Sequence, residues 1–145
     1  MDQVVYQKYL AQQIMSASPA KLVSMLYERA ITLLHQTVKA IEAGDIEQRW
    51  QSNAKATEVI YHLWDTLDRE RGGEIAENLN RLYGFMMMRL TMVDVENDAQ
   101  AARDVIGLLE PLQRSWHEVA ERVEQKAESD DTSDNLTPSK ITISA

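Results

Sequence analysis

Residues 72–96 constrain the fold of this chain more than any other stretch, because they carry two apolar stripes at helical spacing. The first stripe recurs at three- and four-residue steps, as on the buried side of an amphipathic helix; it consists of Ile75, Leu79, Leu82, Met86, Leu90 and Val93. The second stripe lies beside it and consists of Phe85, Met88, Met92 and Val95, extended by Met87. A single stripe closes a small bundle, so the second either packs against another helix of this chain or faces a partner. Methionine adapts to irregular surfaces and is common where a partner binds.

Glycine and proline are sparse and fall at the expected ends of helices, and no stretch alternates like a long strand. Ser18 and Asp45 have the side chains of N-terminal caps, Pro19 suits the first helical position and Gly44 suits a helix end. We therefore predict four helices: 19–43, 46–69, 72–96 and a last one that begins after Asp98. Since the connections are short, the helices form an antiparallel, up-down-up-down, all-α four-helix bundle.

The two ends of the chain differ from this pattern. Residues 1–15 are apolar but too short for an independently stable helix, so we expect a short cap helix that docks on the bundle or stays mobile. Residues 126–145 are polar, acidic and without period, which predicts a disordered tail. The predicted domain therefore covers residues 1–125. Pro111 lies inside the last helix, where we expect a kink and not an end, with Val119 still in the core.

Composition narrows the class of function. A net charge of −8 and a pI near 4.8 argue against nucleic-acid binding and against electrostatic binding to a membrane. No stretch is apolar enough to span a membrane, and no signal peptide or cysteine is present, so we expect a cytoplasmic protein. We find no catalytic constellation, and so expect no enzyme, no cofactor and no metal. The spacings Glu58/His62 and His117/Glu121 are interpreted as surface pairs.

Surplus apolar stripes also occur in the helices predicted at 19–43 and 46–69, so three helices of four are wider than a core needs. A large exposed apolar surface usually marks an interaction site. The candidate binding groove drawn from these stripes comprises Tyr27, Ile31, Leu34, Trp50, Tyr61, Trp64, Phe85, Met87, Met88 and Met92. Its cover is either the N-terminal segment, with Tyr6, Tyr9 and Ile14, or a partner, and the two compete if they use one place.

The chain resembles the FliS family of flagellar export chaperones over about residues 5–123. The resemblance rests on Tyr9 ahead of Pro19, on Trp116 and on four segments: 16–27 (SASPAKLVSMLY), 40–45 (AIEAGD), 67–90 (LDRERGGEIAENLNRLYGFMMMRL) and 96–98 (END). The resemblance implies a cytoplasmic four-helix bundle that binds the disordered C-terminal segment of flagellin, prevents premature polymerisation and presents flagellin to the export apparatus.

The resemblance further implies that the N-terminal cap gives way to flagellin. It also implies that Tyr6 and Tyr9 contact the cytoplasmic domain of the membrane export gate. Two alternatives stay open. One is a structural bundle that self-associates through its spare stripes without a client, and a weak homodimer in the absence of client belongs with it. The other is a bundle enzyme or metal protein.

Overall fold

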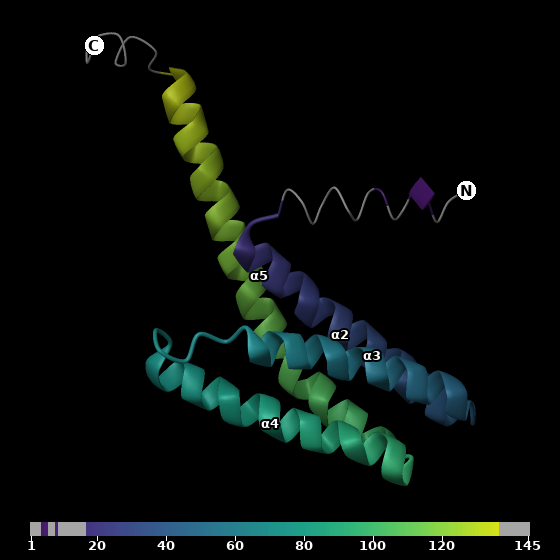
Figure 1. Cartoon of the computed structure of the whole chain (residues 1–145). Helices are drawn as coiled ribbons and strands as arrows, with labels where there is room; N and C mark the ends of the chain where they lie inside the picture. Colours follow the sequence, from purple (N-terminus) through teal and green to yellow (C-terminus); the bar gives the residue numbers. More distant parts are fainter. Residues whose placement is uncertain (1–3, 6–7, 9–16, 137–145) are drawn as a thin grey trace. The chain divides into compact units, whose positions relative to one another are not determined.

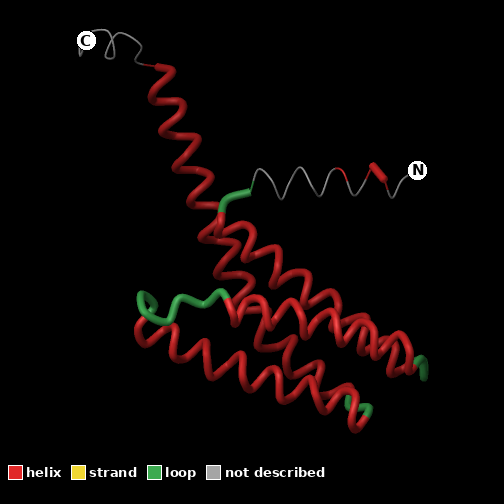
Figure 2. Tube along the Cα trace, viewed as in Figure 1, coloured by secondary structure: helices red, strands yellow, loops and turns green. Residues whose placement is uncertain are grey.

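The computed structural model describes residues 4–5, 8 and 17–136, and it describes side chains as far as residue 130. Four long helices follow one another along the described chain (Figure 1): α2 (Pro19–Glu42), α3 (Ile46–Asp65), α4 (Gly73–Glu96) and α5 (Ala99–Leu136). Within these residues all regular structure is helical, and turns make the connections (Figure 2). The predicted all-α, four-helix architecture is confirmed. Of the predicted cap, residues 4–5 and 8 are helical, and Tyr6, Tyr9 and Ile14 lie outside the described residues.

The chain divides into two compact units. The larger unit is Val23–Arg114, which holds α3, α4 and most of α2. The smaller unit consists of the residues up to Leu22 and those from Ser115 onward. In the smaller unit, Lys21 Nζ of α2 lies 3.4 Å from Glu124 Oε1 of α5, and both side chains are well exposed. No described helix is both long and apolar enough to cross a bilayer.

The predicted caps are formed as expected. Ser18 Oγ accepts the Lys21 amide at 3.2 Å and Asp45 Oδ1 accepts the Gln48 amide at 3.0 Å, so each supplies a partner to an amide of the first helical turn. Gly44 has φ of +70°, a left-handed conformation that costs glycine little and ends α2. At the last corner, Asn97 is left-handed with φ of 55°, and Asp98 Oδ1 accepts the Gln100 amide at 2.9 Å.

Helix α3 ends at Asp65, about one turn before the predicted end at residue 69. Asp68 holds the turn that follows: its Oδ1 accepts the Arg71 amide at 3.1 Å, and its carbonyl accepts the Gly72 amide at 3.1 Å. A side chain at Gly72 would lie 2.5 Å from Ala76 Cβ and 2.9 Å from the Asp68 carbonyl oxygen, so only glycine fits. Polar groups hold this turn, and the apolar period alone did not reveal it.

The core of the larger unit combines the inner stripes of all four helices. Its largest enclosed side chains include Tyr27, Leu33, Leu34, Ile60, Met86, Leu90, Val93, Val105 and Leu109. Two buried polar pairs join neighbouring helices. The hydroxyls of Tyr27 and Tyr83 share a hydrogen bond, and Thr37 Oγ1 lies 2.7 Å from Ser52 Oγ. Burial raises the pKa of Tyr83 above its ordinary value, although the hydrogen bond with Tyr27 opposes the rise.

Helix α5 corrects two expectations about the end of the chain. It passes through Pro111 without ending, as predicted, but Val119 is 40% exposed and Val123 is 44% exposed, so the expectation that Val119 lies in the core is wrong. Residues 126–136, assigned above to a disordered tail, continue α5. Lys126, Ala127 and Glu128 favour a helix at the start of this stretch. Residues 137–145 lie outside the described residues.

Candidate functional site

Helices α3 and α4 pack side by side and run antiparallel (Figure 1). Near the start of α3, Asn53 Nδ2 donates to the Leu90 carbonyl oxygen at 3.0 Å, late in α4. Near the end of α3, Trp64 Nε1 donates to Asn80 Oδ1 at 2.7 Å, early in α4. The two hydrogen bonds fix the register of the antiparallel pair: the start of α3 faces the end of α4, and the end of α3 faces the start of α4.

A polar network holds the end of this pair near the α4–α5 corner. Arg49 Nη1 donates to Asn97 Oδ1 at 2.7 Å, and Arg49 Nε lies 3.4 Å from Asp94 Oδ1, an ion pair without a hydrogen bond at those two atoms. Asn53 Nδ2 also donates to Asp94 Oδ2, at 3.1 Å. The network joins α3 to the last turn of α4 and to the left-handed Asn97. It therefore fixes the position of α3 relative to α4 at this end.

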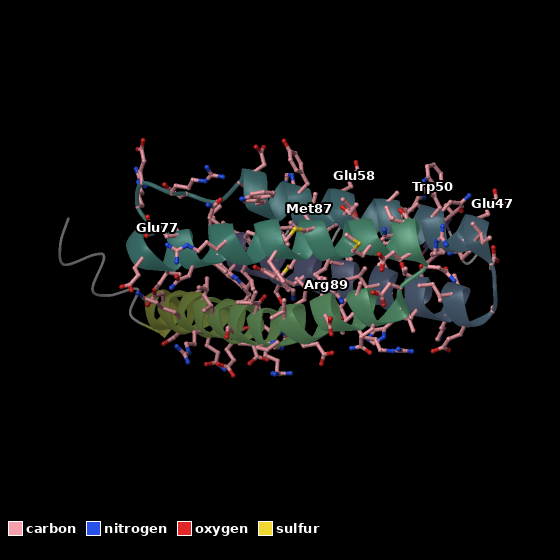
Figure 3. All side chains as sticks on the ribbon, turned by 90° about the horizontal axis from the view of Figure 1, so that it is seen from below. Glu47, Trp50, Glu58, Glu77, Met87 and Arg89 are labelled. Atoms are coloured by element: carbon pink, nitrogen blue, oxygen red, sulfur yellow. The ribbon has the colours of Figure 1, made fainter. Side chains whose placement is uncertain are left out.

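Helix α4 faces α5 with its opposite side. Arg89 Nη2 donates to Asp104 Oδ2 at 2.7 Å, and Arg89 lies between the two helices (Figure 3). Hydrogen bonds from Gln100 and Arg89 lower the pKa of Asp104 below its ordinary value. With α3 on one side, α5 on another and the core on the third, α4 has one remaining side, which faces outward.

Large apolar side chains occupy the outward side of both helices. Trp50 is 60% exposed and Tyr61 is 57% exposed on α3, while on α4 Phe85 is 44%, Met88 60% and Val95 70% exposed. At 100° per residue, Trp50 and Tyr61 lie beyond Asn53 on the side of α3 away from α2, and Met88 and Val95 lie beyond Met87 on α4. In Figure 3, Trp50 projects from the outer side of α3, and Met87 lies at the side of α4 nearer to α3. We call Trp50, Tyr61, Phe85, Met88 and Val95 the α3–α4 face.

Two predicted groove residues belong to the core instead. Tyr27 and Leu34 are both 0% exposed, so the expectation that they line an open groove does not match their places in this structure. The phenol of Tyr27 satisfies its polar end by bonding the hydroxyl of Tyr83, which makes full burial of a tyrosine favourable. Sequence period alone could not tell which apolar stripe of α2 faces inward, because both are apolar.

The remaining predicted groove residues divide by exposure. Trp50, Tyr61, Phe85 and Met88 are exposed on the α3–α4 face, and Trp64, Met87 and Met92 are half-buried on the same two helices. The ring of Trp64 lies over Gly84, where an added Cβ would meet it at an ordinary 3.8 Å. Ile31 is half-buried on α2 and outside this face.

Sequence reasoning left three features of this surface out of the candidate groove. Val95 was in the second apolar stripe but not among the candidate residues, although it is among the most exposed large apolar side chains of α4. Glu47 and Glu58 project from the same side of α3 as Trp50 (Figure 3). Their helical spacing from Trp50, three and eight residues, was the signal that could have found them.

The α3–α4 face offers an apolar surface for binding. No group of three or more His, Cys, Asp or Glu side chains there is placed to hold a metal ion. His117 Nε2 lies 3.1 Å from Glu121 Oε1, and that pair is exposed on α5, far along the chain from the α3–α4 face. An exposed cluster of aromatic and methionine side chains on a bundle is the kind of surface that takes a partner helix.

Comparison with known proteins gives the family. The family model "Flagellar protein FliS" matches residues 1–123. The chain belongs to the FliS family. It is 39% identical over 108 residues to the flagellar secretion chaperone FliS of Salmonella typhimurium, covering 74% of this chain and 80% of that protein. It is 34% identical over 118 residues to FliS of Campylobacter jejuni, covering 81% of this chain and 92% of that protein. This member of the FliS family is thus a flagellar secretion chaperone by descent.

The fold agrees with that of a solved structure. A crystal structure of a bacterial flagellar chaperone matches with a TM-score of 0.67 at 17% identity, covering 84% of this chain and 99% of the other. The FliS-family match ends at residue 123, whereas α5 continues to Leu136, so the last thirteen residues of the helix lie beyond it.

Proposed function

We propose that this FliS-family protein binds the disordered C-terminal segment of flagellin in the cytoplasm, prevents its premature polymerisation and delivers it to the flagellar export apparatus. The observation that carries the proposal is the α3–α4 face, an exposed row of aromatic and methionine side chains on a chain of this family. An unfolded segment gains most by folding as an amphipathic helix against such a row, since one apolar side of the helix then leaves water. The protein acts by stoichiometric binding and needs no catalytic step.

Titration calorimetry with the C-terminal segment of the cognate flagellin tests this proposal. We expect one segment to bind per chaperone, with a negative heat-capacity change because apolar surface is buried, and with a gain in helicity seen by circular dichroism. A titration without heat and without a change in helicity would contradict the proposal.

The N-terminal segment is proposed to cover part of the binding surface and, once flagellin is bound, to contact the cytoplasmic domain of the export gate through Tyr6 and Tyr9. Deleting residues 1–15 is expected to leave the bundle folded, because the cap of α2 is made by Ser18 and needs none of them. The truncated chaperone should bind the flagellin segment at least as tightly as the full chain but lose capture by the export-gate domain. Thermal denaturation, calorimetry and a pull-down measure the three quantities, and an unfolded truncation would show that the segment is part of the core.

Self-association is a second candidate, favoured by the same exposed face, which a second copy of the chain could cover. Light scattering of the chaperone alone and after mixing with the flagellin segment separates the two functions. A dimer that the segment dissociates supports the client proposal. A dimer that persists at saturating segment supports a structural role.

A further inference from the structure

The outer side of α3 carries carboxylates as well as aromatic rings, in one helical row. At steps of three or four residues, the row reads Glu47, Trp50, Ala54, Glu58, Tyr61 and Asp65. Every one of these residues is exposed. Residues so spaced lie on the same side of a helix, so the carboxylate of Glu58 stands between the two aromatic residues (Trp50 and Glu58 are labelled in Figure 3).

These carboxylates differ from most acidic groups that pack between helices of the larger unit. Asp94 pairs with Arg49, Asp104 with Arg89 and Glu42 with Arg103, so those charges are compensated within the fold. Among the described residues, neither Glu58 nor Asp65 has a salt bridge or a side-chain hydrogen bond, and Glu47 accepts a single long bond of 3.4 Å from Gln51. On the outer side of α4, Arg81 is the one described exposed base and Glu77 is an exposed acid. On α3 itself, Lys55 is an exposed base three residues before Glu58. The row therefore carries three carboxylates that form no ion pair among the described residues.

We propose that this row recognises a basic amphipathic helix of the client, with a lysine or arginine of that helix seated at Glu58 between Trp50 and Tyr61. The inference rests on the proposed function and adds the charge and register of the client helix that binds here. Charge complementarity selects such an occupant, because an acidic client helix would place like charges against three carboxylates. An apolar helix with no base would leave Glu58 partly desolvated without a partner, which costs free energy.

The spacing along α3 defines what the client must present. Eleven residues separate Trp50 from Tyr61, or about 16 Å at 1.5 Å per residue, and Glu58 stands about 4.5 Å from the level of Tyr61. A client helix lying along α3 therefore places two apolar residues about eleven positions apart, with a base three or four positions from one of them. Tyr61, three residues from Glu58, is near enough to offer its ring to the cation, which strengthens the pair beyond an isolated surface pair.

The test compares two substitutions with a matched control, using a synthetic C-terminal flagellin segment as the probe and the full-length chaperone. Glu58→Gln removes the charge and Glu58→Lys reverses it. Glu28→Lys makes the same change of net charge at an exposed position of α2. We expect Glu58→Gln to weaken binding roughly fivefold at low salt and Glu58→Lys roughly thirtyfold, with Glu28→Lys within about twofold of the parent. The difference between parent and Glu58→Gln should shrink as salt rises from about 50 to 500 mM, since salt screens exposed charges.

A charge exchange locates the partner of Glu58. Each lysine and arginine of the probe is replaced by glutamate in turn, and each variant is titrated against the parent and Glu58→Lys. One such peptide should bind Glu58→Lys more tightly than it binds the parent, which gives a coupling that independent sites do not show. Equal affinities of parent and Glu58→Gln at every salt concentration, or no peptide that favours Glu58→Lys, would overturn this inference while leaving the proposed function intact. Failure of the parent to bind the unmodified probe would overturn both.

Discussion

Leu90→Ala is expected to lower the free energy of unfolding by about 3 kcal/mol, which corresponds to a fall of roughly 10 °C in the midpoint of thermal denaturation. Leu90 is 1% exposed and lies on the inner side of α4, where Met86 and Val93 are also enclosed at 0%. Removing its branched end leaves a cavity that these neighbours cannot fill without moving. In addition, the Leu90 carbonyl accepts the Asn53 amide, so a shift of the α4 backbone would disturb the contact with α3.

Met88→Ala is the matched control, because it lies on the same helix two residues away and is 60% exposed. Its effect on the free energy of unfolding should stay within about 0.5 kcal/mol. Chemical denaturation followed by circular dichroism measures both. Equal losses for the two variants would mean that the outer stripe is also part of the core, and the α3–α4 face would then not be free to bind.

The helices could be predicted from sequence because several local signals agreed. Ser18, Asp45 and Asp98 cap helices in the structure as their residue types indicated. The predicted helix ends were wrong in polar stretches, because apolar periodicity carries no signal there. After the end of α3, Asp68 holds a turn through its own hydrogen bond, and α5 continues through the polar residues 126–136.

The candidate site was only partly predictable, because periodicity finds stripes but does not say which one faces inward. On α4 the first stripe is buried at Met86, Leu90 and Val93 and Met88 of the second is exposed, but Ile75 of the first stripe is 72% exposed near the start of the helix. On α2 two candidate groove residues, Tyr27 and Leu34, lie in the core, and Tyr27 bonds Tyr83, fifty-six residues away. Partners that distant in the chain cannot be seen in a local pattern. The same limit hid the row of Glu58, whose lack of a partner becomes evident only when the pairing of the other carboxylates is known.

Met88→Glu is expected to weaken binding of the flagellin segment by about a hundredfold while leaving the free energy of unfolding nearly unchanged. The side chain stands in the middle of the outer row of α4, with Phe85 and Val95 on either side along the helix. In the free chaperone a glutamate there meets water and costs little. In the complex it would be covered by apolar client surface without a base to pair it, and burying an unpaired charge is among the costliest changes an interface can suffer.

Ile75→Glu separates this effect from the general effect of added negative charge. Ile75 is 72% exposed on the same helix, but thirteen residues from Met88 and therefore about 140° around the helix axis. Ile75→Glu introduces the same charge outside the α3–α4 face. The affinity of this variant for the flagellin segment should therefore remain within about threefold of that of the parent. Calorimetric titration at about 150 mM salt compares the two variants, with thermal denaturation to confirm that both are folded. If Met88→Glu binds as tightly as Ile75→Glu, the client does not cover the outer side of α4.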